Sequence, residues 1–208
     1  MDVIEAMETC SAARYLKPDP VPQELIERVI YAATRASSPG NSQEWDFIVV
    51  RNPETKQKIR DLLAPRFKAM LAGMRTTGQV TRLSAGAMHL AETLNEVPAI
   101  IFVCGPIAGA WLIQSRASYP PDAPIEQFVW SAPYQAAQNL IVAARSLGLG
   151  TTFTTFHMFM ESELRDLLGI PKEIKFGVMI PIGWPQNDFV KVKRKPISKV
   201  IHWDKWSD

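Results

Sequence analysis

Apolar residues recur at helical spacing between residues 22 and 36, which predicts an amphipathic helix there. Pro22 suits the first turn of this helix, and Glu24 is favourable near its positive end. The apolar face consists of Leu25, Ile26, Val29, Ile30 and Ala33. A shorter helix is predicted over residues 161–168, where Gly169 is placed to end it. Both helices therefore have one face suited to packing on a core.

Three short apolar runs predict buried strands, because they are rich in β-branched and aromatic residues. These runs are residues 45–50, 99–104 and 174–182. Residues 151–156 alternate only weakly, and their pattern fits either a strand or a loop. At least three strands are therefore expected among a larger number of helices.

The remaining helices are predicted from longer and less regular segments. A helix over residues 52–63 is expected to end before Pro65, because proline breaks helix interiors. Residues 66–96 are rich in Ala, Met and Leu and are expected to be helical. A helix is also predicted over residues 125–147, where Pro133 fits either a kink or a new start.

The composition places the chain among ordinary globular proteins. Of its 208 residues, 47% are hydrophobic and 21% are charged, which excludes intrinsic disorder and fibrous repeats. The net charge of +2 provides no broad basic surface, so a nucleic-acid partner is not expected. No repeat or low-complexity linker divides the sequence, and residues 1–208 are predicted to form a single domain.

The two cysteines, Cys10 and Cys104, are far apart and form no Cys-x-x-Cys motif, which favours a reducing compartment. The first residues lack the basic and apolar regions of a signal peptide. The uncharged stretch over residues 97–115 is interrupted by Pro98 and Pro106, so it predicts a strand and a loop better than a membrane span. We therefore expect a cytoplasmic protein without a membrane partner.

Most self-sufficient active-site motifs are missing from the sequence. The three histidines show no metal-ligand spacing, and no phosphate-binding Gly-Lys loop or Gly-x-Ser-x-Gly motif occurs. Gly148 and Gly150 lack the third glycine of a dinucleotide fingerprint and follow a predicted helix, so they fit a helix end and a tight entry into a strand. Difficult chemistry would therefore depend on a bound cofactor.

Four separate segments carry a resemblance to a known family. They read Arg-Tyr-Leu-Lys-Pro-Asp-Pro-Val-Pro at residues 14–22, Ala-Ser-Ser-Pro-Gly-Asn-Ser-Gln-Glu-Trp at 36–45, Gln-Asn-Leu through Gly-Leu-Gly-Thr at 138–151, and Lys-Arg-Lys-Pro at 193–196. In this order and spacing the chain resembles the nitroreductase family of FMN-dependent oxidoreductases. The resemblance covers nearly the whole sequence.

The resemblance implies an α+β sandwich in which helices flank a central, mostly antiparallel sheet. It also implies an intertwined homodimer with FMN at the subunit interface. The implied activity is ping-pong transfer of reducing equivalents from NADPH or NADH to a small electron-poor acceptor, such as a nitroaromatic or a quinone. The reaction would take place at the flavin N5 position, so no side chain is assigned as a catalytic acid or base.

The same resemblance implies which residues contact the cofactor. Arg14 and Arg194 would hold the phosphate or ribityl end, although both fit solvated surface charges as well. A loop of the partner subunit would meet the flavin through Ser38, Asn41 and Gln43, whose types also suit an ordinary turn. The edge around N5 would lie near Thr151, Thr152 and Thr154, which also suit a plain strand.

The sequence departs from the family pattern at the phosphate end. Where the family has Arg-Arg/His-Ser-x-Arg/Lys, this chain has Cys10, Ser11, Ala12, Ala13 and Arg14. The loss of one charged hydrogen bond costs about 1.5–3 kcal/mol. Weaker FMN binding is therefore expected.

Two alternative functions and one functional interpretation of a loop complete the predictions. One alternative is a protein that binds or sequesters flavin without turnover, and another is a different flavin chemistry on the same fold, such as dehalogenation or flavin fragmentation. The connection over residues 105–124, with Trp111, Tyr119 and the following Phe128, is interpreted as a substrate-facing cover because of its length and aromatic content.

Overall fold

An antiparallel sheet lies at the centre of the fold, with strand order β1-β2-β4-β3. The computed structural model describes residues 1–76, 82–106 and 125–206. The strands are β1 (Asp46–Val50), β2 (Ala99–Pro106), β3 (Gly150–Thr151) and β4 (Ile174–Gly183). The α-helices are α1 (Val3–Thr9), α2 (Gln23–Ala33), α3 (Pro53–Thr76), α4 (Arg82–Glu92), α6 (Ile125–Ser146) and α7 (Glu161–Leu168). Short 3₁₀ turns are η1 (Pro39–Asn41), η3 (Phe156–Met160) and η4 (Ile197–Lys199).

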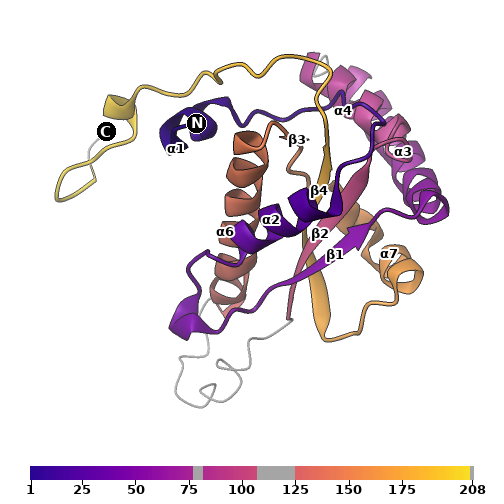
Figure 1. Ribbon diagram of the computed structural model, residues 1–208, viewed down its shortest axis with the longest axis horizontal. Coiled ribbons are helices and arrows are strands. Elements are labelled where there is room, and N and C mark those ends of the chain that lie inside the picture. The colour runs from indigo at the N-terminus through magenta and orange to yellow at the C-terminus, as the bar shows by residue number, and fades with distance from the viewer. Residues whose placement is uncertain (77–81, 107–124, 207–208) are drawn as a thin grey trace.

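Helices cover both faces of this sheet, and β2 separates two apolar clusters. Ile101 and Val103 belong to the cluster under α2 and α6. Ile100 and Phe102 belong to the cluster under α3, α4 and α7. Neighbouring residues of a strand point to opposite faces, which explains why β2 is apolar throughout. Figure 1 shows α2 and α6 on one side of the sheet and α3 and α7 on the other. The predicted α+β sandwich is confirmed.

The predicted end of the third helix before Pro65 is wrong. Helix α3 continues through Pro65 to Thr76. Pro65 lies on the exposed side, so the carbonyl left without an N–H donor faces water. The buried side chains of Ile59, Leu63 and Leu71 continue the apolar face across the proline. Packing of this face against the sheet offsets the cost of the missing helical hydrogen bond.

Helix α6 also contains a proline, and Pro133 is part of a close contact with the sheet. A Cβ atom at Gly105 would lie 2.9 Å from Pro133 Cγ, and one at Gly177 would lie 2.9 Å from Trp130 Cζ3. Glycine at these two positions therefore lets α6 approach the strands closely. Pro133 lies inside α6 and does not start a new helix.

The structure corrects the start of one predicted loop and shows which of two alternatives holds for residues 151–156. Gly105 and Pro106 belong to β2, so the predicted connection begins later than expected. The rest of that connection, including Trp111 and Tyr119, lies outside the described residues, and Phe128 belongs to α6. Within residues 151–156, only Thr151 belongs to a strand, while Thr154 forms a single bridge to Met179.

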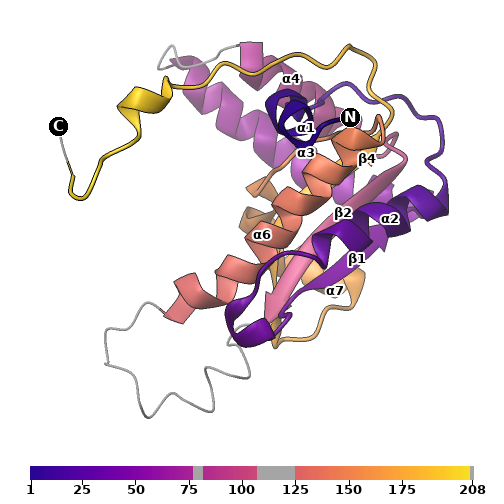
Figure 2. The same cartoon turned by 60° about the vertical axis from the view of Figure 1, so that its left-hand side comes forward.

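The C-terminal segment leaves the body of the molecule. After β4 it runs past α1 and ends far from the sheet, as both views show (Figures 1 and 2). Large apolar side chains are exposed along it, namely Val190, Ile197, Val200, Ile201, Trp203 and Trp206. The segment therefore carries apolar surface that its own chain leaves uncovered.

Candidate functional site

The N-terminal segment that holds several predicted flavin residues lies along the edge of the sheet beyond β3. Ala12 forms a parallel bridge with Thr151, and the Ala13 N–H donates to the Thr151 carbonyl at 2.8 Å. The Thr152 hydroxyl donates to the Ala13 carbonyl at 2.9 Å. A Cβ atom at Gly150 would lie 2.6 Å from that of Ala13, so glycine permits this close approach. The structure therefore brings Ala12, Thr151 and Thr152 together.

A cavity of about 420 Å³ opens beside this segment. Its wall consists of Ser11, Ala12, Ala13, Arg14, Tyr15, Ala85, Gly86, Pro185, Asn187, Asp188, Phe189 and Val190. A Cβ atom at Gly86 would lie 3.1 Å from Arg14 Cδ, so the absence of a side chain on α4 leaves room for the arginine. Arg14 is half-buried and makes no hydrogen bond or ion pair with any described residue. Its guanidinium is therefore free to bind an anion or an electronegative ring edge.

Arg14 also borders a second, narrower cavity of about 60 Å³. Thr152 and Thr154 line it together with apolar residues of α3, α4 and the core, which are Leu63, Phe67, Ala87, Leu90, Ala91, Leu94, Phe156 and Met179. The ring of Tyr15 stacks on His89 of α4 at a centroid distance of 4.3 Å, which holds the N-terminal segment against that helix. Arg14 thus lines both cavities, and the larger one has the greater share of polar surface.

Cys10 lines neither of the two cavities. Its thiol donates to the Met7 carbonyl at 3.3 Å, and its side chain packs against the core cluster under α2 and α6. The residue before it, Thr9, accepts a hydrogen bond from Arg145 Nε at 2.8 Å. The structure therefore places a cation of α6 beside the position where the sequence has lost an arginine.

The predicted loop residues Ser38, Asn41 and Gln43 lie at the opposite end of the sheet. The loop leads directly into β1, whose first residue pairs with Cys104, whereas Thr151 pairs with Ile182 at the other end. Figure 1 shows this separation, with the loop at the lower left and the N-terminal segment at the top. One chain therefore does not bring these loop residues to Arg14.

The loop is nevertheless a constrained structure. The Gln43 N–H donates to Ser38 Oγ at 3.1 Å, and Asn41 and Gln43 have φ values of 55° and 53°. Asparagine tolerates this left-handed region better than most residues. The side chains of Ser42 and Glu44 each bury an oxygen without a hydrogen-bond partner within the described parts of the chain. Buried oxygens of this kind point to a missing donor.

Arg194 also lies apart from Arg14 in this chain. It is exposed on the C-terminal segment, and its Nη1 donates only to the neighbouring Lys193 carbonyl at 3.3 Å. The segment is fixed a few residues earlier, where the Val192 N–H donates to the Glu8 carbonyl at 3.1 Å. Arg194 therefore does not meet the other predicted site residues within this chain.

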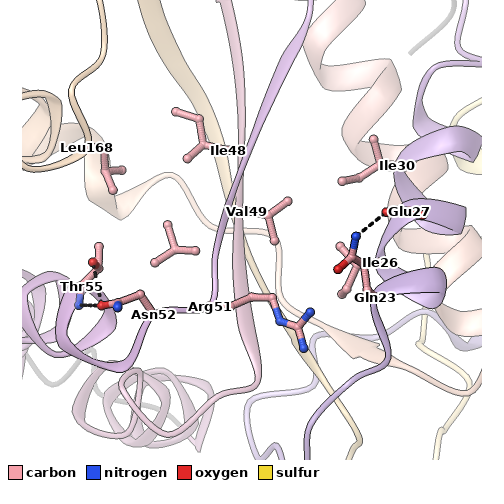
Figure 3. Close-up of a pocket in the computed structure, with 11 residues that line it drawn as sticks. Gln23, Ile26, Glu27, Ile30, Ile48, Val49, Arg51, Asn52, Thr55 and Leu168 are labelled. Carbon is pink, nitrogen blue, oxygen red and sulfur yellow. Dashed lines mark hydrogen bonds between the residues drawn. The ribbon is translucent and has the colours of Figure 1, made fainter.

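A wider groove of about 510 Å³ runs along β1, which pairs with β2 on its other side. Figure 3 shows Ile26 and Ile30 of α2 facing Val49, while Ile48 and Leu168 lie across the strand. None of the predicted flavin residues lines this groove. It is an apolar surface at a sheet edge, and it is separate from the two cavities around Arg14.

The strongest pKa perturbations lie in the core and outside the cavities. Burial lowers the pKa of His157 to about 4, and the ring packs edge-on against Phe102 and Phe176. Burial also raises the pKa of Cys104 to about 12, so this thiol stays protonated. Within the described residues there is no metal-binding cluster of His, Cys, Asp and Glu. No helix among them is long and apolar enough to span a membrane.

Comparison with known proteins agrees with this geometry. A model of the family described as the nitroreductase family matches residues 9–184, a span that contains both cavities around Arg14 apart from Pro185 and residues 187–190. The chain belongs to the nitroreductase family. Membership confirms the family prediction from the four sequence segments and identifies this nitroreductase-family chain as an oxidoreductase.

Relatives within the nitroreductase family carry different names. Mouse iodotyrosine deiodinase 1 is 28% identical over 205 residues, which cover 95% of this chain and 67% of the mouse protein. The chain thus spans about two thirds of that relative's length. The NADH dehydrogenase of Thermus thermophilus is 26% identical over 200 residues, which cover 95% of this chain and 93% of that protein.

A solved structure shows the same fold. The crystal structure of oxidized iodotyrosine deiodinase bound to FMN and 3-iodo-L-tyrosine has a TM-score of 0.75, with 19% identity. The match covers 99% of this chain and 100% of that one. The likeness establishes a nitroreductase-type architecture for the whole described chain.

Part of the cavity wall of this nitroreductase-family protein is not predicted from the sequence. Ala85 and Gly86 lie in the weakly periodic segment that carried no motif, and residues 187–190 precede the tail motif. Only the glycine offered a signal, because a glycine inside a predicted helix often marks a close approach. Arg145 lies within the predicted helix over residues 125–147, and its spacing carries no further signal.

Proposed function

We propose that this chain is an FMN-dependent oxidoreductase that passes reducing equivalents from NADH or NADPH to an electron-poor small molecule, such as a nitroaromatic or a quinone. The observation that carries the proposal is that Arg14 lines both cavities, a larger one whose wall includes the polar residues Ser11 and Asn187 and a narrower one that is almost wholly apolar. FMN has the same division, since a charged phosphate and polar ribityl chain continue into a flat aromatic ring. The guanidinium of Arg14, which is unpaired among the described residues, suits the phosphate or the ribityl end of such a ligand.

The residues around Arg14 fit such a ligand. Gly86 leaves space beside the arginine, and Ser11 adds a hydroxyl to the wall of the larger cavity. Thr152 and Thr154 line the narrower cavity, and their hydroxyl groups form hydrogen bonds with the Ala13 carbonyl and the Phe156 N–H. When bound, FMN accepts a hydride and passes electrons on, while these residues bind it, orient it and limit the access of water.

We further propose a homodimer that completes the site. In one chain Ser38, Asn41 and Gln43 lie far from Arg14, and Arg194 is exposed on an extended segment. Apolar surface is uncovered on that C-terminal segment and in the groove along β1. A second copy would cover apolar surface of this kind and would bring the loop of one subunit to the cavities of the other. Sedimentation equilibrium of the full chain tests this, and a monomer that binds FMN stoichiometrically would overturn it.

The activity is tested with visible spectra of the purified protein after addition of FMN. Anaerobic NADPH, and NADH in a separate sample, should bleach the bound flavin, and a nitroaromatic or a quinone should restore its colour. Flavin that binds but stays oxidised with both nucleotides would support the alternative of a binding or sequestering protein, which the changes at Cys10 and Ala12 motivate. Failure to bind FMN would overturn both functions.

Reductive dehalogenation is a second candidate, and the similarity to mouse iodotyrosine deiodinase over 95% of the chain favours it. The test uses 3-iodo-L-tyrosine with the reduced protein, and release of iodide is the measurement. If quinones reoxidise the reduced protein but no iodide is released, only the first proposed function, electron transfer to an electron-poor acceptor, is retained. Release of iodide at a rate above that with quinones would reverse the order of the two.

A further inference from the structure

Arg145, in the last turn of α6, is held beside the segment that has lost its family arginine. Its Nε donates to Thr9 Oγ1 at 2.8 Å. The Thr9 hydroxyl donates in turn to the Glu5 carbonyl at 2.6 Å, so its oxygen lone pairs face the arginine. Thr9 is only 7% exposed and directly precedes Cys10. This pair of hydrogen bonds fixes the direction of the Arg145 side chain.

An aromatic ring fixes the other side of the same guanidinium. Arg145 Cζ lies 3.9 Å from the ring centroid of Phe189, which is cation–π contact distance. Phe189 is also part of the wall of the larger cavity, together with Ser11 and Arg14. The chain after Phe189 is tied down by the ion pair between Lys191 and Glu8 at 2.5 Å. The guanidinium of Arg145 therefore contacts Phe189, and the ring of Phe189 forms part of the wall of the larger cavity.

The terminal nitrogens of Arg145 remain available. Nη1 and Nη2 make no hydrogen bond to the described residues, and no carboxylate pairs with them there. Arg66 and Arg165 differ in this respect, because they pair with Glu163 and Glu161. An arginine held by Nε and by a ring, with both Nη groups free, offers a preorganised pair of donors to an anion.

We infer that Arg145 binds the phosphate group of the flavin and substitutes for the arginine that the family pattern has at position 10. The inference rests on the proposed function, because it concerns the phosphate of the same flavin; Arg145 itself does not line the larger cavity and contacts its wall through Phe189. Arg14 and Arg145 would then provide cations from two different elements, the N-terminal segment and α6. Binding of a phosphate monoester would depend on Arg145, whereas binding of the ring would not.

The test compares FMN with riboflavin, which has the same ring and ribityl chain but no phosphate. Fluorescence titration gives the dissociation constants of both flavins for the unaltered chain and for Arg145→Gln. The ratio of the riboflavin constant to the FMN constant should fall about tenfold or more in Arg145→Gln, while riboflavin affinity stays the same. Arg28→Gln, which removes one exposed charge from α2, is the matched control and should leave the ratio unchanged.

A second variant tests the substitution itself. Adding Cys10→Arg to Arg145→Gln should recover most of the lost preference for FMN, since it restores a cation to the family position. An unchanged ratio in Arg145→Gln, or an equal loss of both flavins, would overturn the inference and leave a structural role as a clamp on Phe189. If the unaltered chain binds FMN no better than riboflavin, the phosphate is not recognised and the inference also fails. If it binds neither, the proposed function fails with it.

Discussion

The hydroxyl of Thr152 and the carbonyl of Ala13 form a hydrogen bond of 2.9 Å that joins the end of β3 to the segment carrying Arg14. Thr152 is buried, so its replacement by valine would keep the shape and remove the donor. We expect Thr152→Val to lower the free energy of unfolding by about 1 kcal/mol in urea denaturation and to weaken FMN binding. Thr34→Val, which removes a hydroxyl that donates to the Tyr31 carbonyl at the C-terminal end of α2, should leave FMN binding unchanged. Equal FMN affinity in both variants would contradict the role given to this bond.

Restoration of the family arginine provides a prediction about affinity. Cys10→Arg should tighten FMN binding by up to about tenfold, because it adds a charged hydrogen bond at the phosphate end. Cys10→Ser is the control, since it changes the thiol without adding charge. The measurement is the quenching of FMN fluorescence on titration. Unchanged or weaker binding would show that position 10 does not reach the phosphate in this chain.

His157 predicts a specific loss of stability in acid. Burial lowers its pKa from 6.5 to about 4, so the unfolded chain binds a proton below pH 6.5 that the folded chain does not. The stabilisation is complete above pH 6.5 and is lost as the pH falls toward 4. Between pH 7 and pH 5 the free energy of unfolding should fall by about 2 kcal/mol more in the unaltered protein than in His157→Leu. The check is urea denaturation at both pH values, and identical pH dependence of the two proteins would refute the assignment.

Replacement of two glycines by alanine should change the free energy of unfolding in opposite directions. At Gly150 the new methyl group would lie 2.6 Å from Ala13 Cβ, and we expect a loss of about 1–3 kcal/mol in the free energy of unfolding. At Gly73, inside α3, an added Cβ would meet no described atom within 4 Å apart from the helix's own backbone, and alanine should add about 0.5–1 kcal/mol through its helix propensity. Thermal denaturation of both variants decides the matter. A stabilising Gly150→Ala would mean that the segment does not lie against β3 in solution.

The elements that could be predicted from the sequence are those whose own residues show a clear apolar pattern. The runs that form β1, β2 and β4 are apolar enough to be recognised, and α2 and α7 have a clear apolar face. The end of α3 could not be predicted, because tolerance of Pro65 depends on its exposure and on packing by Ile59 and Leu63. The sequence around Pro65 does not show whether the proline faces water or the sheet, and this exposure decides whether the helix can continue through it.

The candidate site was predictable in part. The motif residues Arg14, Thr152 and Thr154 do converge on one cavity, because the N-terminal segment pairs with the strand that precedes Thr152. The contributions of Gly86, Phe189 and Arg145 depend on contacts between segments far apart in the chain. No local pattern encodes such contacts, so they follow only from the fold.

The bridge between Ala12 and Thr151 has a consequence for solubility. Residues 12–17 cover the free edge of β3 and continue along the end of β4, where the Lys17 N–H donates to the Trp184 carbonyl at 2.8 Å. An uncovered strand edge is a template for pairing with other chains. The segment that would bind the cofactor therefore also covers this strand edge and protects it from pairing with other chains. Conditions that strip the flavin and loosen the segment should expose that edge, so cofactor retention and shelf life are expected to decline together.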